Sequence, residues 1–246
     1  MEKLIEGYRR FRDGGWTSHR GRMETLAAEG QKPHALIVAC SDSRADPAMV
    51  FDTAPGELFV VRNVANLVPP FAPDGDFHGT SAALEFGVRV LEVPNIVVMG
   101  HQKCGGINAL VHGFPEQVQD FVKPWMRMAQ PAVDAARAAG TPEDLIDDVC
   151  EHETVKLSLA NLRTFPWIAE REAAGFLIDR LGQRLMTAAR AIEMDMQHGR
   201  LLCVEERARH GTRGWRGSPV THRARSMRSD ITIIGIARGA RSAHLS

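Results

Sequence analysis

The chain has 246 residues, of which 44% are hydrophobic, and its 30 basic and 30 acidic side chains give a formal net charge of zero. This length suits one domain, or one domain with an appendage, and the absence of any run of about 18 apolar residues excludes a membrane-spanning helix. The amino terminus lacks the apolar segment of a signal peptide, and the four cysteines do not suggest a disulfide scaffold, so we expect a cytoplasmic protein.

The first part of the chain predicts a helical arm and two strands. Residues 1–34 carry apolar positions at helical spacing, broken near Gly14 and Gly15, and form the predicted N-terminal arm. Residues 36–40 are apolar and β-branched and predict the first strand. Asp46 followed by Pro47 then predicts a helix start, with the aspartate as N-cap and the proline at the first helical position. Residues 57–61 predict the second strand.

The following segments continue the alternation of helices and strands. After a loop rich in proline and glycine, Thr80 begins a predicted helix that reaches about residue 91, and residues 96–99 predict a third strand. Another helix is expected from Gly105, one or two lie within residues 115–140, and a long one begins near residue 142 and ends near Pro166. This alternation is typical of βαβ units, so we predict an α/β domain over residues 35–177, with a mostly parallel central sheet flanked by helices.

Residues 178–246 differ in composition from the rest and form an atypical C-terminal tail. They contain 13 arginines, no lysine and six acidic residues, whereas residues 1–177 contain 17 basic and 24 acidic residues. Residues 180–196 are compatible with a helix and residues 231–236 with a strand, but arginine-rich sequence of low periodicity is often poorly ordered, and we assign no fold here.

Chemistry-bearing residues follow two of the predicted strands. Cys40 ends the first strand, and His101 and Cys104 follow the third; the carboxyl ends of parallel strands share one edge of a sheet, where sites usually form. Thiolate, imidazole and carboxylate groups are zinc ligands, so Asp42 is a possible fourth ligand. Alternatively Asp42 pairs with Arg44, and a water whose pKa zinc can lower to about 7 takes the vacant position.

Two less specific interpretations compete with a catalytic zinc site. In the first, Cys40 is only a buried core cysteine and His101-x-x-Cys104 is a coincidence; on spacing alone this interpretation and a zinc site are about equally favoured. A structural zinc site is the second alternative. Structural sites usually have four closed cysteine and histidine ligands, however, and an aspartate beside an arginine favours a gated position instead.

Four motifs together resemble the β-class carbonic anhydrases. They are Ala-Cys-Ser-Asp-Ser-Arg at 39–44, Phe-Val-Val-Arg-Asn-Val-Ala-Asn at 59–66, Gly-His-x-x-Cys-Gly-Gly at 100–106 and Asn-Leu-Arg-Thr-Phe-Pro at 161–166. The likeness covers about residues 4–175. Members of this family continue with a further strand after the last motif, and the sequence beyond residue 175 shows no counterpart to it.

The resemblance implies a role for each matching residue. Cys40, His101 and Cys104 correspond to the ligands of one zinc ion per subunit, and Asp42 with Arg44 corresponds to a gating dyad that can exchange the carboxylate with the metal. The residues that correspond to the substrate pocket are Gln31, Phe59, Val64, Phe86 and Gly105. Phe86 stands where many members have tyrosine, so a hydroxyl role at this position is absent.

The implied activity is the reversible hydration of CO2 to bicarbonate and a proton, which makes the protein a lyase of the carbonate dehydratase type. The family also implies a homodimer or homotetramer in which the N-terminal arms embrace the partner. Some bacterial members have a second, inhibitory bicarbonate pocket, but Ile37 and Phe86 replace two of its residues here and leave only Arg62, so we predict that this pocket is absent.

Three alternatives remain. A carbon disulfide or carbonyl sulfide hydrolase would use the same metal centre, and a protein altered by its tail would bind zinc without turnover. A nucleic-acid partner for the tail is disfavoured, because basic runs are usually only solvated. The change to arginine without lysine suggests instead, as a hypothesis, out-of-frame translation of the end of the gene, which resequencing the gene would test.

Overall fold

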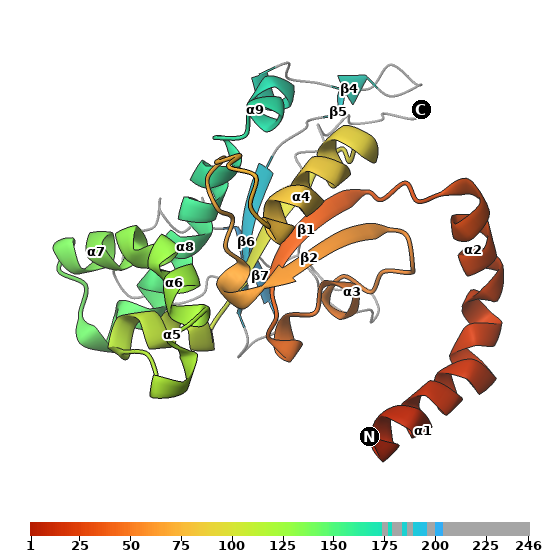
Figure 1. The fold of residues 1–246 in the computed structure, drawn as a ribbon, viewed down its shortest axis with the longest axis horizontal. Coiled ribbons are helices and arrows are strands. Elements are labelled where there is room, and N and C mark those ends of the chain that lie inside the picture. Colours follow the sequence, from red (N-terminus) through yellow and green to blue (C-terminus); the bar gives the residue numbers. More distant parts are fainter. Residues whose placement is uncertain (174–176, 179–183, 186–188, 196–199, 204–246) are drawn as a thin grey trace, which may run out of the picture.

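The computed structural model describes residues 1–173, 177–178, 184–185, 189–195 and 200–203. It shows a central sheet with helices around it and a long helical arm that projects to one side (Figure 1). The predicted α/β class is therefore confirmed. Among the described residues, none of the helices combines the length and the apolar character needed to cross a bilayer.

Three parallel strands form the part of the sheet from which the two cysteine-bearing loops emerge. They are β1 (Ala35–Cys40), β2 (Leu58–Asn63) and β3 (Ile96–His101), with β1 between the other two. All three lie within one or two residues of the predicted ranges. The residues of β1 are almost completely buried, because neighbouring strands and helices cover both faces, which explains why the strand is apolar throughout.

The sheet continues on the far side of β3. There β6 (Ala189–Asp195) pairs with β3 in parallel, and β7 (Arg200–Cys203) pairs with β6 in antiparallel fashion. The sequence beyond residue 175 shows no counterpart to the family's further strand, but the structure does place a strand beside β3, which is therefore not an open edge. Residues 189–195 form a strand because they pair with β3, and the sequence pattern of the tail does not predict this strand.

The helix considered for residues 180–196 is also wrong wherever this range is described. Besides β6, the short strands β4 (Leu177–Ile178) and β5 (Arg184–Leu185) form a separate antiparallel pair. A backbone hydrogen bonded to a neighbouring strand overrides a sequence pattern that is only compatible with a helix. The strand considered for residues 231–236 lies outside the described residues.

Seven α-helices surround the sheet within the described part of the chain. They are α3 (Pro47–Val50), α4 (Gly79–Glu85), α5 (Gly105–His112), α6 (Val122–Met126), α7 (Gln130–Ala138), α8 (Ile146–Leu162) and α9 (Pro166–Ala173). The predicted start of α3 is confirmed, since the Asp46 carboxylate accepts the backbone N–H groups of Ala48 and Met49 at 2.9 and 3.3 Å. The Pro166 prediction is half right: α8 ends just before it, and α9 begins at it.

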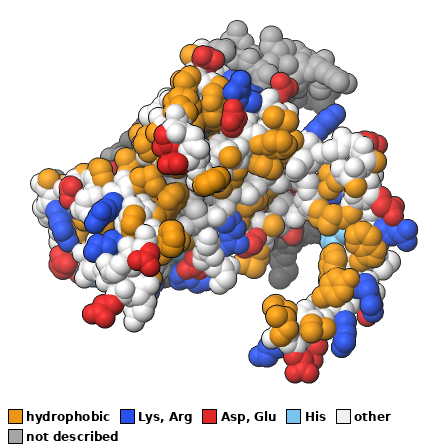
Figure 2. Space-filling view, in the orientation of Figure 1, with side chains coloured by type: hydrophobic (Ala, Val, Ile, Leu, Met, Phe, Trp, Pro, Cys, Tyr) orange, Lys and Arg blue, Asp and Glu red, His pale blue; other side chains and the backbone are white. Residues whose placement is uncertain are grey.

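The N-terminal arm consists of α1 (Glu2–Arg10) and α2 (Trp16–Glu29), joined by a π-helical turn at Phe11–Gly15. The predicted break near Gly14 and Gly15 is thus a single π-helical turn, and the helix continues through it. The second half of the arm touches the body, where Arg22 donates to the Pro55 carbonyl oxygen at 2.5 Å. The first half presents exposed apolar side chains along its length, among them Leu4, Ile5, Tyr8 and Phe11 (Figure 2).

The core is divided by the sheet. Alternate residues of β1 and β3 enter different clusters: Leu36, Val38 and Val98 pack with α4, α8 and α9 on one face, whereas Ile37 and Met99 pack on the other. A further cluster at the carboxyl end of the strands contains Cys40 and Cys104 together with apolar residues of α5 to α8. The two cysteines are therefore part of the packed core.

Candidate metal centre

The first loop of the site is held by its own short-range hydrogen bonds. It leaves β1 at Cys40, and the Ser41 N–H continues the ladder to the Asn63 carbonyl oxygen at 2.8 Å. The Asp42 carboxylate then caps a 3-10 turn by accepting the backbone N–H of Arg44 at 2.9 Å. An aspartate at such a cap fixes the direction in which the chain turns away from the strand.

The second loop leaves the neighbouring strand at His101. Lys103 adopts φ +56°, in the left-handed region that residues with a side chain rarely occupy, and Cys104 is the N-cap of α5. Because β1 and β3 are adjacent and parallel, the two loops emerge at the same edge of the sheet. The topology alone brings both cysteines and the histidine together.

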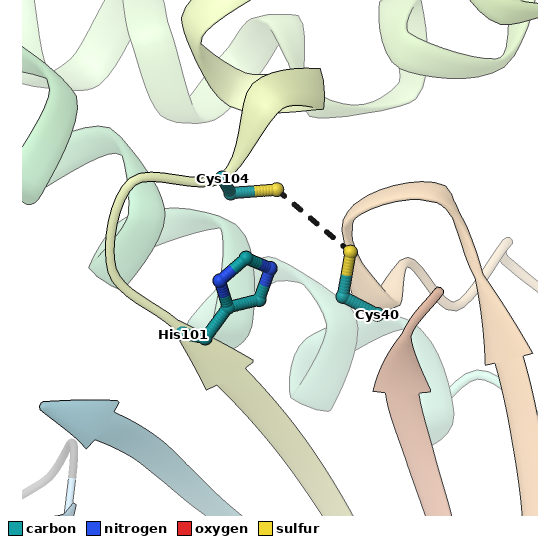
Figure 3. A group of neighbouring side chains, drawn as sticks. All are labelled: Cys40, His101 and Cys104. Carbon is teal, nitrogen blue, oxygen red and sulfur yellow. Dashed lines mark hydrogen bonds between the residues drawn. The ribbon is translucent and has the colours of Figure 1, made fainter. Parts of the chain in front are cut away.

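The side chains of Cys40, His101 and Cys104 converge (Figure 3), and their ligand atoms all lie within 4.8 Å of one another. The two sulfurs are 4.0 Å apart. Two thiolates bound to one tetrahedral zinc at about 2.3 Å would lie about 3.8 Å apart, so this spacing fits a shared metal. All three residues are buried, with at most 5% of their surface exposed.

The hydrogen bonding of His101 leaves one ring nitrogen for a metal. Its Nδ1 lies 3.0 Å from the carbonyl oxygen of Gln102, which can only accept, so Nδ1 carries the proton and donates. The other nitrogen, Nε2, is buried and has no hydrogen-bond partner in the described part of the chain. A buried lone pair beside two thiols is the arrangement expected of an imidazole ligand.

The two thiols influence each other's ionisation. The Cys104 thiol lowers the pKa of Cys40, because its S–H stabilises a neighbouring thiolate, and the same pairing together with burial raises the pKa of Cys104. One negative sulfur is therefore favoured and the second opposed. A divalent cation would stabilise both, and with neutral His101 the three donors would balance its charge.

Asp42 lies beside this group and is paired with Arg44. The guanidinium donates to both carboxylate oxygens, from Nε to Oδ1 at 2.9 Å and from Nη2 to Oδ2 at 2.7 Å. This bidentate pair holds the pKa of the Asp42 carboxyl well below its usual range. In this conformation the carboxylate is engaged by Arg44, which corresponds to the second of the two alternatives that the sequence leaves open.

Arg62 holds the backbone of the first loop from the adjacent strand. Its guanidinium donates to the carbonyl oxygens of Cys40 at 3.0 Å and Asp42 at 2.7 Å, and to the Asp46 carboxylate at 2.7 Å. Three acceptors on one loop fix the position of the Cys40 sulfur relative to Asp42.

The predicted substrate residues fall into two groups. Val64 and Gly105 lie at the metal edge: Val64 packs against the cluster that contains both cysteines, and Gly105 opens α5 directly after Cys104. Gln31, Phe59 and Phe86 do not join them. Gln31 precedes the amino end of β1, whereas Cys40 forms its carboxyl end.

Phe59 and Phe86 lie together in the amino-terminal half of the sheet. Their ring centroids are 6.0 Å apart, and Phe59 pairs in register with Leu36, the second residue of β1. Phe86 is 46% exposed. A single copy of the chain therefore does not bring these two rings to its own group of metal ligands.

Glu151 is not among the residues predicted from the sequence. It lies on α8, only 4% exposed, and its Oε1 accepts the backbone N–H of the ligand residue Cys104 at 2.7 Å. The sequence carries no clear signal for it, because the buried side of α8 mixes polar residues such as Thr154 and Ser158 with apolar ones, so an acidic residue there does not stand out as a buried partner of the metal centre.

Comparisons with known proteins agree with this geometry. Residues 35–179 match the family model described as carbonic anhydrase. A carbonic anhydrase of Synechococcus elongatus is 37% identical to the chain over 183 residues, which are 72% of this chain and 65% of that protein. The match thus spans just under two thirds of the relative's own length.

Two solved structures are similar in fold. The β-carbonic anhydrase CcaA superimposes with a TM-score of 0.69 and 32% identity over 82% of this chain and 86% of the other. A structure described as one of two tetrameric β-carbonic anhydrases from Sordaria macrospora gives a TM-score of 0.61 and 25% identity over 81% of this chain and 96% of the other.

Proposed function

The chain belongs to the β-carbonic anhydrase family, and we propose that it catalyses the reversible hydration of CO2 to bicarbonate and a proton. The observation that carries this proposal is the convergence of two thiols and one imidazole at the carboxyl edge of the sheet, beside a carboxylate held by an arginine. Family relatives named carbonic anhydrase support the same reaction.

The cofactor we propose is one zinc ion per subunit, held by Cys40, His101 and Cys104. Soft thiolates and an imidazole in a tetrahedral arrangement favour zinc over harder cations. When bound with three protein ligands, zinc supplies a Lewis acid that makes water nucleophilic near neutral pH. The spacing of the two sulfurs and the buried Nε2 of His101 support this assignment.

The chain's own residues then divide the remaining tasks. Arg44 holds the Asp42 carboxylate away from the group of three, so that the fourth position stays accessible to substrate. Val64 provides apolar surface for CO2, which needs no charged binding group. Gly105, at the first turn of α5, offers a backbone N–H to the bicarbonate anion, which the amino end of a helix favours.

We further propose that the protein works as a homodimer or as a homotetramer built from dimers. Gln31, Phe59 and Phe86 lie away from the chain's own metal group, and a second copy can receive them at its site. The exposed apolar side chains of the arm provide a surface for that partner. The similar β-carbonic anhydrases of Sordaria macrospora are described as tetrameric, which supports assembly.

Stopped-flow measurement of CO2 hydration by purified protein of known zinc content tests the proposed activity. We expect turnover in the wild type and a loss of about 10- to 100-fold in Asp42→Ala, because Asp42 orients Arg44, which also holds the Lys103 carbonyl oxygen beside the ligand Cys104. Zinc binding without CO2 turnover would contradict the proposal. Turnover of carbon disulfide or carbonyl sulfide by the same preparation would favour the hydrolase alternative instead.

Other aspects of the assignment stay predictions. The absence of an inhibitory bicarbonate pocket is supported by Arg62, whose guanidinium is occupied by three acceptors of the first loop. A bicarbonate ion bound at Arg62 away from the metal would refute it. The cytoplasmic location, the division into residues 1–34, 35–177 and 178–246, and the frameshift hypothesis for the tail also remain to be tested.

A further inference from the structure

The peptide group between Lys103 and Cys104 is held from both sides by charged side chains. Its carbonyl oxygen accepts a hydrogen bond from Nη2 of Arg44 at 3.0 Å, and its N–H donates to Oε1 of Glu151 at 2.7 Å. The cation and the anion come from different elements, the first loop and α8. One peptide plane therefore links both loops of the metal centre to a helix behind them.

This peptide needs an external constraint more than its neighbours do. It follows Lys103, whose φ of +56° is unfavourable for a residue with a Cβ, and it directly precedes the sulfur-bearing residue Cys104. Rotation of this plane would change ψ of Lys103 and φ of Cys104, and with them the backbone direction at Cys104. The sulfur of Cys104 would then move relative to Cys40 and His101.

Glu151 also supplies a cap that α5 lacks. In a capping box, a glutamate or glutamine at the third helical position accepts the N–H of the N-cap residue. Cys104 is the N-cap of α5, and the third helical position is Ile107, whose side chain cannot accept a hydrogen bond. The carboxylate of Glu151 takes this role from α8 instead, next to the positive end of the α5 dipole.

The two side chains that hold this peptide differ in how deeply they are buried. Glu151 is 4% exposed, while the side chain of Arg44, on the other side of the peptide, is 43% exposed. A buried carboxylate is costly unless it accepts hydrogen bonds, so its place on α8 indicates a specific requirement for a hydrogen-bond acceptor at the Cys104 N–H. Arg44 is shared between this peptide and Asp42, so Glu151 is the firmer of the two constraints.

We infer that Glu151 is a positioning residue of the metal centre: by accepting the Cys104 N–H, it sets the orientation of the Lys103–Cys104 peptide and thereby the place of the Cys104 sulfur. The inference rests on the proposed zinc site. It concerns how tightly and in what geometry the three ligands hold the metal, and it does not require that the bound metal hydrates CO2.

Metal affinity in variants of Glu151 tests this role. Zinc is titrated against a chromophoric chelator with the wild type and with Glu151→Ala, Glu151→Asp and Glu151→Gln. Loss of an outer partner of a metal ligand typically costs about 10- to 100-fold in affinity, and we expect this for alanine. Aspartate, one methylene shorter, should also weaken binding, whereas glutamine keeps an accepting oxygen and should stay within about threefold of the wild type.

A second readout reports ligand geometry directly. In the cobalt(II)-substituted protein, we expect the sulfur-to-metal and d–d absorption bands to shift in Glu151→Ala and to return towards the wild-type spectrum in Glu151→Gln. Glu153→Ala is the matched control, because Glu153 lies on the same helix but pairs with Lys156 at 2.6 Å near the surface. It should leave both affinity and spectrum unchanged.

The outcomes separate this inference from the proposed function. Wild-type affinity and spectrum in Glu151→Asp and Glu151→Ala would overturn the inference, and so would an equal loss in Glu151→Gln and Glu151→Ala. If alanine is not recovered folded, aspartate and glutamine decide. A wild type that binds zinc but does not hydrate CO2 would refute only the activity, and a wild type that binds no zinc would refute both.

Discussion

Asp42 shows how one side chain can satisfy two different sequence patterns. A carboxylate two residues after a thiolate is suited to bind a metal, and one two residues before an arginine is suited to pair with it. In the structure Arg44 holds both carboxylate oxygens, and a backbone N–H adds a third hydrogen bond. Each of these donors stabilises the charged form of Asp42.

The lowered pKa of Asp42 predicts a specific dependence of stability on pH. Because Arg44 depresses the pKa in the folded state, the stabilising contribution is complete above the ordinary carboxyl value of about 4 and is lost as the pH falls through the folded value. The difference in unfolding temperature between the wild type and Asp42→Asn should therefore be constant from about pH 8 to 5 and shrink below about pH 4. A difference that disappears near neutral pH would contradict the ion pair.

The two thiols predict how many protons leave when zinc binds. Cys40 has a lowered pKa and Cys104 a raised one, so the metal-free pair retains close to one proton near neutral pH. Zinc binding should release about one proton and lose about tenfold in affinity per unit fall in pH. Titration calorimetry in buffers of different ionisation enthalpy measures this number. Burial lowers the pKa of His101, but the neighbouring Cys40 raises it on balance, so the count is made at about pH 8 or above, and release of two protons there would contradict an ionised Cys40.

The ligands could be predicted from the sequence, but the residues that support them could not. Cys40, His101 and Cys104 follow strands that are readable as apolar runs, and parallel strands gather their carboxyl ends. The contact of Glu151 with Cys104 joins residues 47 positions apart through the packing of α8, which no local pattern encodes. The remote positions of Gln31, Phe59 and Phe86 likewise depend on tertiary packing.

At the scale of elements, the strands that could be predicted are those whose sequence is continuously apolar. β1 and β3 are buried on both faces and are therefore continuous apolar runs, so their ranges could be predicted within one or two residues. β6 carries charged residues at three of its seven positions and lies beyond a change in composition. Its strand conformation comes from the hydrogen-bonding edge of β3, which is information from another part of the chain.

The junction of α5 with the loop after β2 predicts a contrast between two adjacent glycines. A Cβ on Gly106 would lie 2.9 Å from Val64 Cγ1 and 3.3 Å from Ala65 Cβ, whereas a Cβ on Gly105 would meet nothing within 4 Å. Gly106→Ala should therefore destabilise the protein by about 1–3 kcal/mol, measured by urea unfolding. Gly105→Ala is the control and should have little effect. Equal effects would mean that helix propensity, and not close packing, determines both.

At the scale of the whole molecule, the arm predicts how copies associate. Its first half carries exposed apolar residues, such as Leu4 and Tyr8, without covering the chain's own body (Figure 1). Leu4→Glu combined with Tyr8→Glu should shift the protein towards monomers, because charged side chains oppose burial against a partner. Sedimentation velocity measures the shift, with Lys3→Glu as a control for the change in charge. An unchanged oligomer would exclude the arm from the interface.

The pairing of β6 with β3 also has a consequence for how the protein is made. The two strands are about 90 residues apart in the chain, and such distant contacts form late and slow folding. β1, β2 and β3 emerge from the ribosome well before β6, together with the loops that carry the metal ligands. Until β6 arrives, the open edge of β3 can pair with another nascent chain, so the interval between the two strands is when newly made copies are most at risk of aggregating.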